Sequence, residues 1–195
     1  MYLHVVFLLL WWLLPSMAAY AQSPQYETIT VNDGLSQGMV YDILQSRDGY
    51  IWIATKDGLN RYDGSRFEVF SPDPFNAFSI SGSEVTNLFE DRNGLIWVSL
   101  PGQLEVFDPN SRRFFHVMHE GQPVSGRGYA FLAETPDGAV WLTDDSHIWK
   151  IHIPEGLLEK AVTTGTANIT PSCRHIALRR ADGETEPPPR ATRIF

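Results

Sequence analysis

Short apolar stretches alternate with turns rich in Gly, Asp and Asn along most of the chain beyond residue 22. In the first part of this region the pattern predicts four short β-strands, over about 39–45, 50–56, 59–62 and 66–70. The second of these strands contains Ile51-Trp52-Ile53 and is apolar on both faces, which is typical of a sheet packed between two other sheets. The dipeptides Asp48-Gly49 and Asn93-Gly94 favour type I′ hairpin turns, which need positive φ at both central residues.

The whole pattern recurs after 45 and then 44 residues, which is the spacing of Trp52, Trp97 and Trp141. Four strands per unit and a period in the mid-forties are typical of β-propeller blades, whereas a β-sandwich, the alternative, needs no such regular repeat. We therefore expect an all-β chain of about three blades, each of four antiparallel strands, in an incomplete ring. The residues that define this repeat signature are Asp48, Gly49, Trp52, Asp57, Gly58, Tyr62, Asp63, Asn93, Gly94, Trp97, Asp108, Asp137, Gly138 and Trp141.

We expect the blades to occupy residues 22–154, with repeats over about 36–80, 81–124 and 125–162. Beyond them, the next Trp of the repeat is due near Glu186, but the chain instead reads Pro187-Pro188-Pro189, which lacks the donors of a β-ladder. We expect residues 163–195 to be mostly disordered, or an aberrant tail left by a truncated or frameshifted reading frame.

The first 21 residues have the features of a secretory signal peptide. Val5–Leu14 is an unbroken apolar run, and Ala19-Tyr20-Ala21 supplies the small residues that a signal peptidase reads, so that the mature chain starts at Gln22. The alternative is an uncleaved membrane anchor, because Met1–Ala21 is almost wholly apolar. Both interpretations place the remaining chain in the periplasm or outside the cytoplasm.

Composition narrows the classes of partner. The 195 residues include 15 Lys and Arg against 23 Asp and Glu, a net charge of −8, and no basic stripe that would bind nucleic acid. The single cysteine, Cys173, excludes a disulfide within the chain. It lies in a polar stretch with no predicted structure, so we interpret it as an incidental thiol rather than a nucleophile.

Three stretches of the first repeat resemble the two-component regulator propeller repeat: Gly34-Leu35-Ser36-Gln37, Val40–Gln45 and Asp48–Gly64. The resemblance extends from Tyr26 to about Ile153, and it weakens at Ser99–Gly102 and Thr143–Ser146. Such repeats form the periplasmic sensor of hybrid histidine kinases. The resemblance implies a sensor that is followed by further propeller and kinase regions, binds an oligosaccharide ligand and is dimeric at full length.

Several side chains are candidates for chemistry, but each has a simpler structural interpretation. His116, His119, His147 and His152 are expected to be polar rim residues rather than metal ligands, because strands alternate their faces. Asp144-Asp145 is expected to be a solvated turn rather than a Ca²⁺ site. The three repeat tryptophans are expected to pack in the core rather than stack on sugars.

The chain also lacks the motifs of catalysis. It contains no G-x-S-x-G elbow and no Gly-rich nucleotide-binding box, and the residues after His175 do not match a kinase phosphoacceptor. We therefore assign no catalytic, cofactor-binding or metal-binding residue and no cofactor, and we expect that the chain is not an enzyme.

The expected function is that of an extracytoplasmic, glycan-responsive sensing segment of a two-component histidine kinase, truncated before the kinase. Two alternatives stay open. One is a propeller lyase of the streptogramin-inactivating type, which uses a His, acidic residues and Mg²⁺. The other is a non-catalytic interaction scaffold.

Overall fold

The computed structural model describes residues 26–124, 129–144 and 147–177. After a short 3₁₀ helix, Val31–Asp33, the first antiparallel sheet consists of β1 (Val40–Gln45), β2 (Ile51–Thr55), β3 (Gly58–Tyr62) and β4 (Phe67–Phe70), paired in chain order. We call this sheet blade one. Its four strands confirm the sequence prediction for the first repeat.

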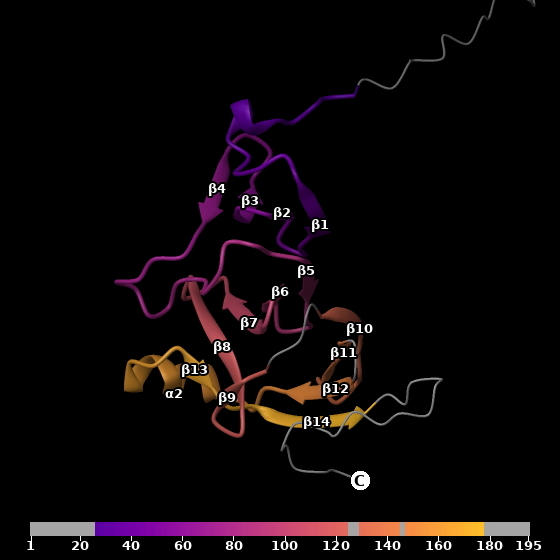
Figure 1. Cartoon of the computed structure of the whole chain (residues 1–195), viewed down its shortest axis with the longest axis vertical. Helices are drawn as coiled ribbons and strands as arrows, with labels where there is room; N and C mark the ends of the chain where they lie inside the picture. The colour runs from indigo at the N-terminus through magenta and orange to yellow at the C-terminus, as the bar shows by residue number, and fades with distance from the viewer. Residues whose placement is uncertain (1–25, 125–128, 145–146, 178–195) are drawn as a thin grey trace, which may run out of the picture.

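The second sheet, blade two, consists of β5 (Asn87–Glu90), β6 (Ile96–Leu100), β7 (Gln103–Asp108) and β8 (Arg113–His119), with β9 (Gln122–Pro123) pairing with β8. The third, blade three, consists of β10 (Ala130–Glu134), β11 (Val140–Thr143), β12 (His147–His152) and β14 (Ser172–Ala177). The three blades follow one another from the top to the bottom of Figure 1, with β5 next to both β1 and β10. In the part of the chain that the structure describes, they form an open series of propeller blades and not a closed ring, as predicted.

Two hydrophobic clusters hold the blades together. Between blades one and two, Trp52 and Leu59 pack against Val98, Phe107 and Phe114. A second cluster lies between blades two and three and includes Trp97, Val106, Phe115, Leu142, Trp149 and Ile151. Blade two is therefore apolar on both faces, which explains why its strands do not alternate between apolar and polar residues.

The turn between β1 and β2 differs from the predicted type I′ geometry. Gly49 has a φ of +91°, whereas Asp48 is not among the described residues with positive φ. The N–H of Gly49 donates to Ser46 O, and the N–H of Ser46 donates to Tyr50 O. The loop is thus a type I turn closed by a left-handed glycine, a longer hairpin connection that needs positive φ at one position only.

The chain remains ordered beyond residue 163, so the expectation of disorder from 163 onward is wrong for residues 163–177. Helix α2 (Leu157–Thr164) leads into β13 (Asn168–Ile169), which pairs in parallel with β8 of blade two. The chain then returns as β14 to complete blade three beside β12. Figure 1 shows α2 and β13 beside β8, away from the sheet that they interrupt. Ile169 on β13 and Cys173 on β14 are both buried, so this segment packs against blades two and three.

The expected signal peptide, residues 1–21, and the proline-rich tail, 187–189, lie outside the described residues. Among the residues that are described, no helix has the length and apolar character needed to cross a membrane.

Candidate functional site: the inter-blade polar network

Each repeat tryptophan hydrogen-bonds to the residue six positions earlier in the chain. The indole N–H donates to Ser46 Oγ from Trp52 (3.0 Å), to Asp91 Oδ2 from Trp97 (2.9 Å) and to Thr135 Oγ1 from Trp141 (3.3 Å). These three acceptors begin the hairpin turns of the three blades. The tryptophan side chain therefore joins the turn to the middle of the sheet.

The three tryptophans differ in burial. Trp52 and Trp97 are 0% and 1% exposed, whereas Trp141 is only partly buried. The first two lie in the clusters between blades, as expected for core residues. Trp141 occupies the equivalent place in blade three, whose corresponding face is not covered by another blade in the described residues.

Most of the other signature residues shape turns, whereas Tyr62 ends β3 and stacks on Phe67. Asp48, Asn93 and Asp137 precede the turn glycines. Asp63 follows β3, Asp108 ends β7, and both accept backbone N–H groups of residues that come shortly after them. Gly58 has a φ of +125°, and a Cβ there would lie 2.9 Å from Phe70 O, so only glycine fits without a shift of the backbone. These positions fix the blade geometry and do not converge on one ligand site.

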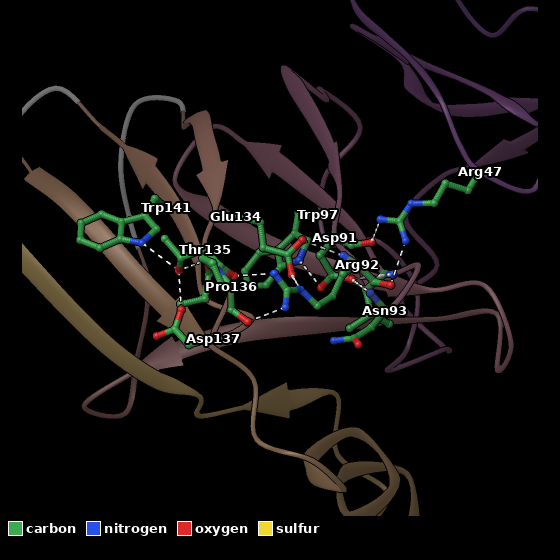
Figure 2. A network of polar contacts seen from close by, with 12 residues as sticks. Arg47, Asp91, Arg92, Asn93, Trp97, Glu134, Thr135, Pro136, Asp137 and Trp141 are labelled. Atoms are coloured by element: carbon green, nitrogen blue, oxygen red, sulfur yellow. Dashed lines mark hydrogen bonds and ion pairs between the residues drawn. The ribbon is translucent and has the colours of Figure 1, made fainter.

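Arg47 joins the turn of blade one to that of blade two. Its backbone N–H donates to Glu90 Oε2 at 3.0 Å, and its guanidinium donates to the carbonyl oxygens of Arg92 (2.8 Å) and Asp91. Figure 2 shows the guanidinium of Arg47 directed at these carbonyl groups.

Arg92 repeats this arrangement one blade later. Its backbone N–H donates to Glu134 Oε2 at 2.8 Å, and Nε donates to Glu134 Oε1 at 2.5 Å. Its terminal nitrogens donate to Pro136 O and Thr135 O, each at 2.6 Å (Figure 2). We call Arg47 and Arg92, with their acceptors, the arginine clamp. The equivalent residue of blade three is Pro136, which has no side chain that could continue the clamp.

Burial and ion pairing shift the pKa values of two acidic groups in this network in opposite directions. Burial raises the pKa of Asp91, although Trp97 and the backbone N–H groups of Leu95 and Asn93 donate to it. The Lys150 ammonium, 2.8 Å from Asp137, and the Thr135 hydroxyl hold the pKa of Asp137 well below its usual range.

A carboxylate is buried in blade two where blade one has an amide. The Asn60 side chain accepts the N–H of Ser36 at 2.9 Å, and Glu105, 45 residues later, accepts the N–H of Ser81 at 3.0 Å. The Glu105 side chain is 0% exposed, and its Oε1 also lies 2.9 Å from His116 Nδ1. Burial disfavours the charged imidazole of His116 and by itself lowers its pKa. The hydrogen bond to Glu105 and the charge of Glu105 outweigh this effect, so that the pKa of His116 is raised.

The histidines that were weighed as metal ligands lie in different surroundings. His116 pairs with Glu105, and His152 is exposed. His119 and His147 both contact Trp149, with ring centroids 5.8 Å apart in each case. No group of three or more His, Cys, Asp or Glu side chains suited to a metal ion occurs among the described residues.

Two expectations about local structure are wrong: that Asp144 is a solvated turn residue, and that Cys173 lies in a stretch without structure. The Asp144 side chain is only 5% exposed, because it accepts hydrogen bonds from the Trp149 indole (2.8 Å) and the His147 N–H (2.7 Å); it is not a solvated turn residue. Asp145 lies outside the described residues. Cys173 lies on strand β14, where burial raises the pKa of its thiol to about 12 and makes it a poor nucleophile.

The outward face of blade three is polar. Trp141, Lys150 and Arg174 form one row across β11, β12 and β14. Lys150 Nζ lies 5.6 Å from the centroid of the Trp141 ring. A hollow of about 210 Å³ on this face is lined by Asp137, Lys150, His152, Ser172 and Arg174. We call this surface the Trp141 face.

Sequence reasoning missed the arginine clamp and the buried Glu105. The repeat contained a signal for the arginine clamp. Arg47 and Arg92 are 45 residues apart, and Glu90 and Glu134 are 44 residues apart, in register with the tryptophans. A matched Arg and a matched Glu in consecutive repeats indicate a contact that is itself repeated.

Comparison with known proteins confirms the family resemblance. Residues 34–57 and 79–102 match the model of the two component regulator propeller family. A histidine kinase of Formosa agariphila, named P4, is 39% identical over 66 residues, which cover 34% of this chain and 5% of the kinase.

Solved structures show the same fold. The extracellular domain of a hybrid two component system from B. thetaiotaomicron aligns with a TM-score of 0.58 at 22% identity, over 65% of this chain and 19% of that domain. The extracellular domain of a one component system from the same organism aligns with a TM-score of 0.51 at 23% identity, over 64% of this chain and 16% of that domain. This chain thus spans less than a fifth of each of these two domains and 5% of the histidine kinase.

Proposed function

We propose that this chain is a ligand-sensing propeller segment that acts outside the cytoplasm as part of a two-component histidine kinase system. The observation that carries the proposal is the pair of regulator propeller repeats on consecutive blades, at 34–57 and 79–102. The similarity to a histidine kinase and the shared fold of two extracellular sensor domains support it. The role is binding and transmission, without catalysis by this chain.

The arginine clamp offers a physical route for transmission along the blades. Arg47 and Arg92 each hold the turn of the following blade by charge-assisted bonds to two backbone carbonyl groups. Because these bonds oppose a change in the spacing of two neighbouring blades, a displacement of one blade by a ligand is passed to its neighbour as long as the bonds hold.

The ligand that we propose is an oligosaccharide, the class that the family resemblance implies. The secreted chain is to be titrated with a panel of neutral and acidic oligosaccharides, with amino acids and nucleotides as controls, while its thermal unfolding midpoint is followed. A saturable rise in the midpoint is expected with at least one oligosaccharide, because a ligand that binds only the folded state stabilises it. A rise with a control ligand and none with any oligosaccharide refutes the glycan class.

The signalling role is tested in the source bacterium. Arg92→Ala, introduced on the chromosome, is expected to weaken induction of the transcripts that respond to the oligosaccharide, while the exposed Arg66→Ala serves as the matched control. Protein levels are measured in parallel. Normal induction in Arg92→Ala cells with normal protein levels contradicts transmission through the clamp. Ligand binding by the chain is measured separately, through the thermal unfolding midpoint, so that loss of binding and loss of transmission are distinguished.

Export is a further part of the proposal. Intact-mass analysis of the periplasmic product is expected to give a chain that starts at Gln22. A mass that retains residues 1–21 instead indicates an uncleaved anchor.

A further inference from the structure

The connection between blades one and two, residues 71–86, is bonded to a buried acid–base pair of blade two. The N–H of Ser81 donates to Glu105 Oε1 at 3.0 Å, and His116 Nδ1 lies 2.9 Å from the same oxygen. The carbonyl group of Ala77 accepts a further hydrogen bond from the His116 ring. Two backbone groups of the connection are thus held by one carboxylate and one imidazole.

The carboxylate of this pair depends on the charge of the imidazole. The Glu105 side chain is 0% exposed, and its Oε2 atom is buried with no hydrogen-bond partner among the described residues. A buried carboxylate with an unsatisfied oxygen is costly unless a cation lies beside it. When His116 loses its proton, the carboxylate is therefore stabilised by contact with water and destabilised by the segment that covers it.

The elements around His116 offer no replacement for its charge in the part of the chain that the structure describes. Its register partner on β13 is the neutral Asn168. The charged side chains of the neighbouring elements have other partners: Arg113 lies 4.8 Å from the centroid of the Phe78 ring, Arg61 and Arg112 pair with Glu68, Asp73 accepts the N–H of Phe75, and Glu84 accepts the hydroxyl group of Tyr41.

We propose that the Glu105–His116 pair is a proton-operated latch, which fastens the connection 71–86 to blade two when His116 is charged and releases it when His116 is neutral. The pair itself stays in place, because Glu105 and His116 are register partners in the ladder of β7 and β8. The connection is held by single hydrogen bonds and is the part that yields. The ligand of this site is the proton, so the proposal does not depend on the oligosaccharide.

The direction of the switch follows from the groups that contact His116. Burial by itself lowers the pKa of His116, but the hydrogen bonds to Glu105 and Ala77 and the charge of Glu105 outweigh it, so that the pKa is raised while the latch is closed. In the open state the ring is in water, where its pKa is about 6.5. The latch is therefore fully closed below about pH 6.5 and opens as the pH rises through the raised pKa.

Blade one contains the same joint without a titratable pair. The N–H of Ser36 donates to Asn60 Oδ1 at 2.9 Å, as its counterpart in blade two donates to Glu105. The register partner of Asn60 on the outer strand is Val69, where Glu105 has His116. The Ser36 amide is therefore an internal reference, and Glu105→Asn combined with His116→Val gives blade two the pair that blade one uses.

The test is amide hydrogen exchange of the full secreted chain, followed by NMR between about pH 5.5 and pH 8 and corrected for the intrinsic exchange rate at each pH. The protection of the Ser81 amide is expected to fall as the pH rises, by up to about tenfold per pH unit, the limit for loss of one proton. The Phe114 amide, which donates to Phe78 O at 2.9 Å, should follow it. The midpoint of the fall should coincide with the titration of the His116 ring resonances, and protection at Ser36 should stay constant.

In the Glu105→Asn, His116→Val chain, the protection of Ser81 is expected to be independent of pH. A fall at Ser81 equal to that of the parent chain assigns the effect to another group and overturns the proposal. Constant protection of Ser81 in the parent chain also overturns it, as does an equal fall at Ser36, which indicates loosening of the whole series of blades. The comparison of Ser81 with Ser36 within the parent chain decides the question even where the double variant does not fold.

Discussion

At the scale of residues, stability depends on side chains that pack in the core of the sheet and also hydrogen-bond to the neighbouring turn. The Trp97 ring is 1% exposed between blades two and three, and its N–H reaches Asp91 at the start of the preceding turn. Asp91 also accepts the N–H groups of Asn93 and Leu95. Loss of the indole removes core packing and leaves a buried carboxylate with fewer donors, so the two effects add.

Trp97→Ala is expected to lower the free energy of unfolding by about 3–5 kcal/mol, the range for large aromatic side chains in a core. Trp141→Ala should cost less, because Trp141 is only partly buried and its bond to Thr135 is longer, at 3.3 Å. Urea unfolding followed by circular dichroism measures both. Equal losses at the two positions would contradict the difference in burial.

His116 is expected to make stability depend on pH. Its pKa in the folded state is raised by Glu105, against the opposing effect of burial, relative to an unfolded value of about 6.5. The stabilisation by the charged pair is therefore complete below about pH 6.5 and is lost as the pH rises through the folded-state pKa. His116→Gln should flatten the fall in unfolding midpoint over this range.

The comparison is made by thermal unfolding at a series of pH values, with the exposed His152→Gln as control. If the midpoints of the parent and His116→Gln chains fall equally between about pH 6 and pH 8, His116 does not carry this dependence.

At the scale of elements, turns and connections fasten one blade to the next. The hairpin turns are joined by the arginine clamp at one end of the sheets. On the outer side, α2 leaves blade three, β13 pairs with β8 of blade two, and the N–H of His116 donates to Ala167 O at 2.8 Å. Neighbouring blades are therefore linked by side-chain bonds and by the chain itself, in addition to the apolar clusters.

Arg92→Ala is expected to cost about 1 kcal/mol of unfolding free energy, because charge-assisted bonds to the backbone are favourable but this side chain is 44% exposed. Arg92→Lys should restore little, since one ammonium group cannot bond to two carbonyl groups and a carboxylate in the same geometry. Arg66→Ala, measured alongside by urea unfolding, should have almost no effect. Full recovery by lysine would indicate that charge alone matters at this position.

Ile169→Ala is expected to loosen the β13–β8 pairing, because Ile169 is 1% exposed and belongs to the cluster between blades two and three. Hydrogen exchange at the His116 amide should become faster, while amides of β2 and β3 in blade one keep their rates. A uniform increase across all three blades would instead indicate global destabilisation.

At the scale of the whole molecule, the two ends of the described series of blades differ in chemistry. The Trp141 face at one end carries Lys150, His152 and Arg174. The sheet of blade one, at the other end, exposes apolar side chains, with Ile43 at 61% and Val69 at 42%. An apolar patch on a sheet face tends to drive association, whereas a charged one resists it.

The chain of residues 22–195 is therefore expected to self-associate through blade one. Size-exclusion chromatography with light scattering should show oligomers whose fraction grows with concentration. Ile43→Lys combined with Val69→Lys should shift the chain toward the monomer, and Arg174→Glu, at the opposite end, should not. A monodisperse monomer at all concentrations would contradict this expectation.

The sequence alone determined the period, the strands and the number of blades, because these depend on local spacing. Turn glycines and tryptophans at intervals of 45 and 44 residues specify where each strand begins, whichever residues it later touches. The strands of blade one, such as Ile51–Thr55 against the predicted 50–56, differ from the prediction by no more than a single position at either end.

The burial of polar groups was decided by the tertiary structure. Asn60 and Glu105 occupy equivalent positions and are both fully buried, but only the fold places His116 beside the Glu105 carboxylate, which raises the pKa of His116. Polar composition also suggested disorder after residue 163, but β8 and β12 both offered open edges, and pairing with them ordered the chain to Ala177. Hydrogen-bonding partners distant in sequence supply the free energy that a local pattern does not contain.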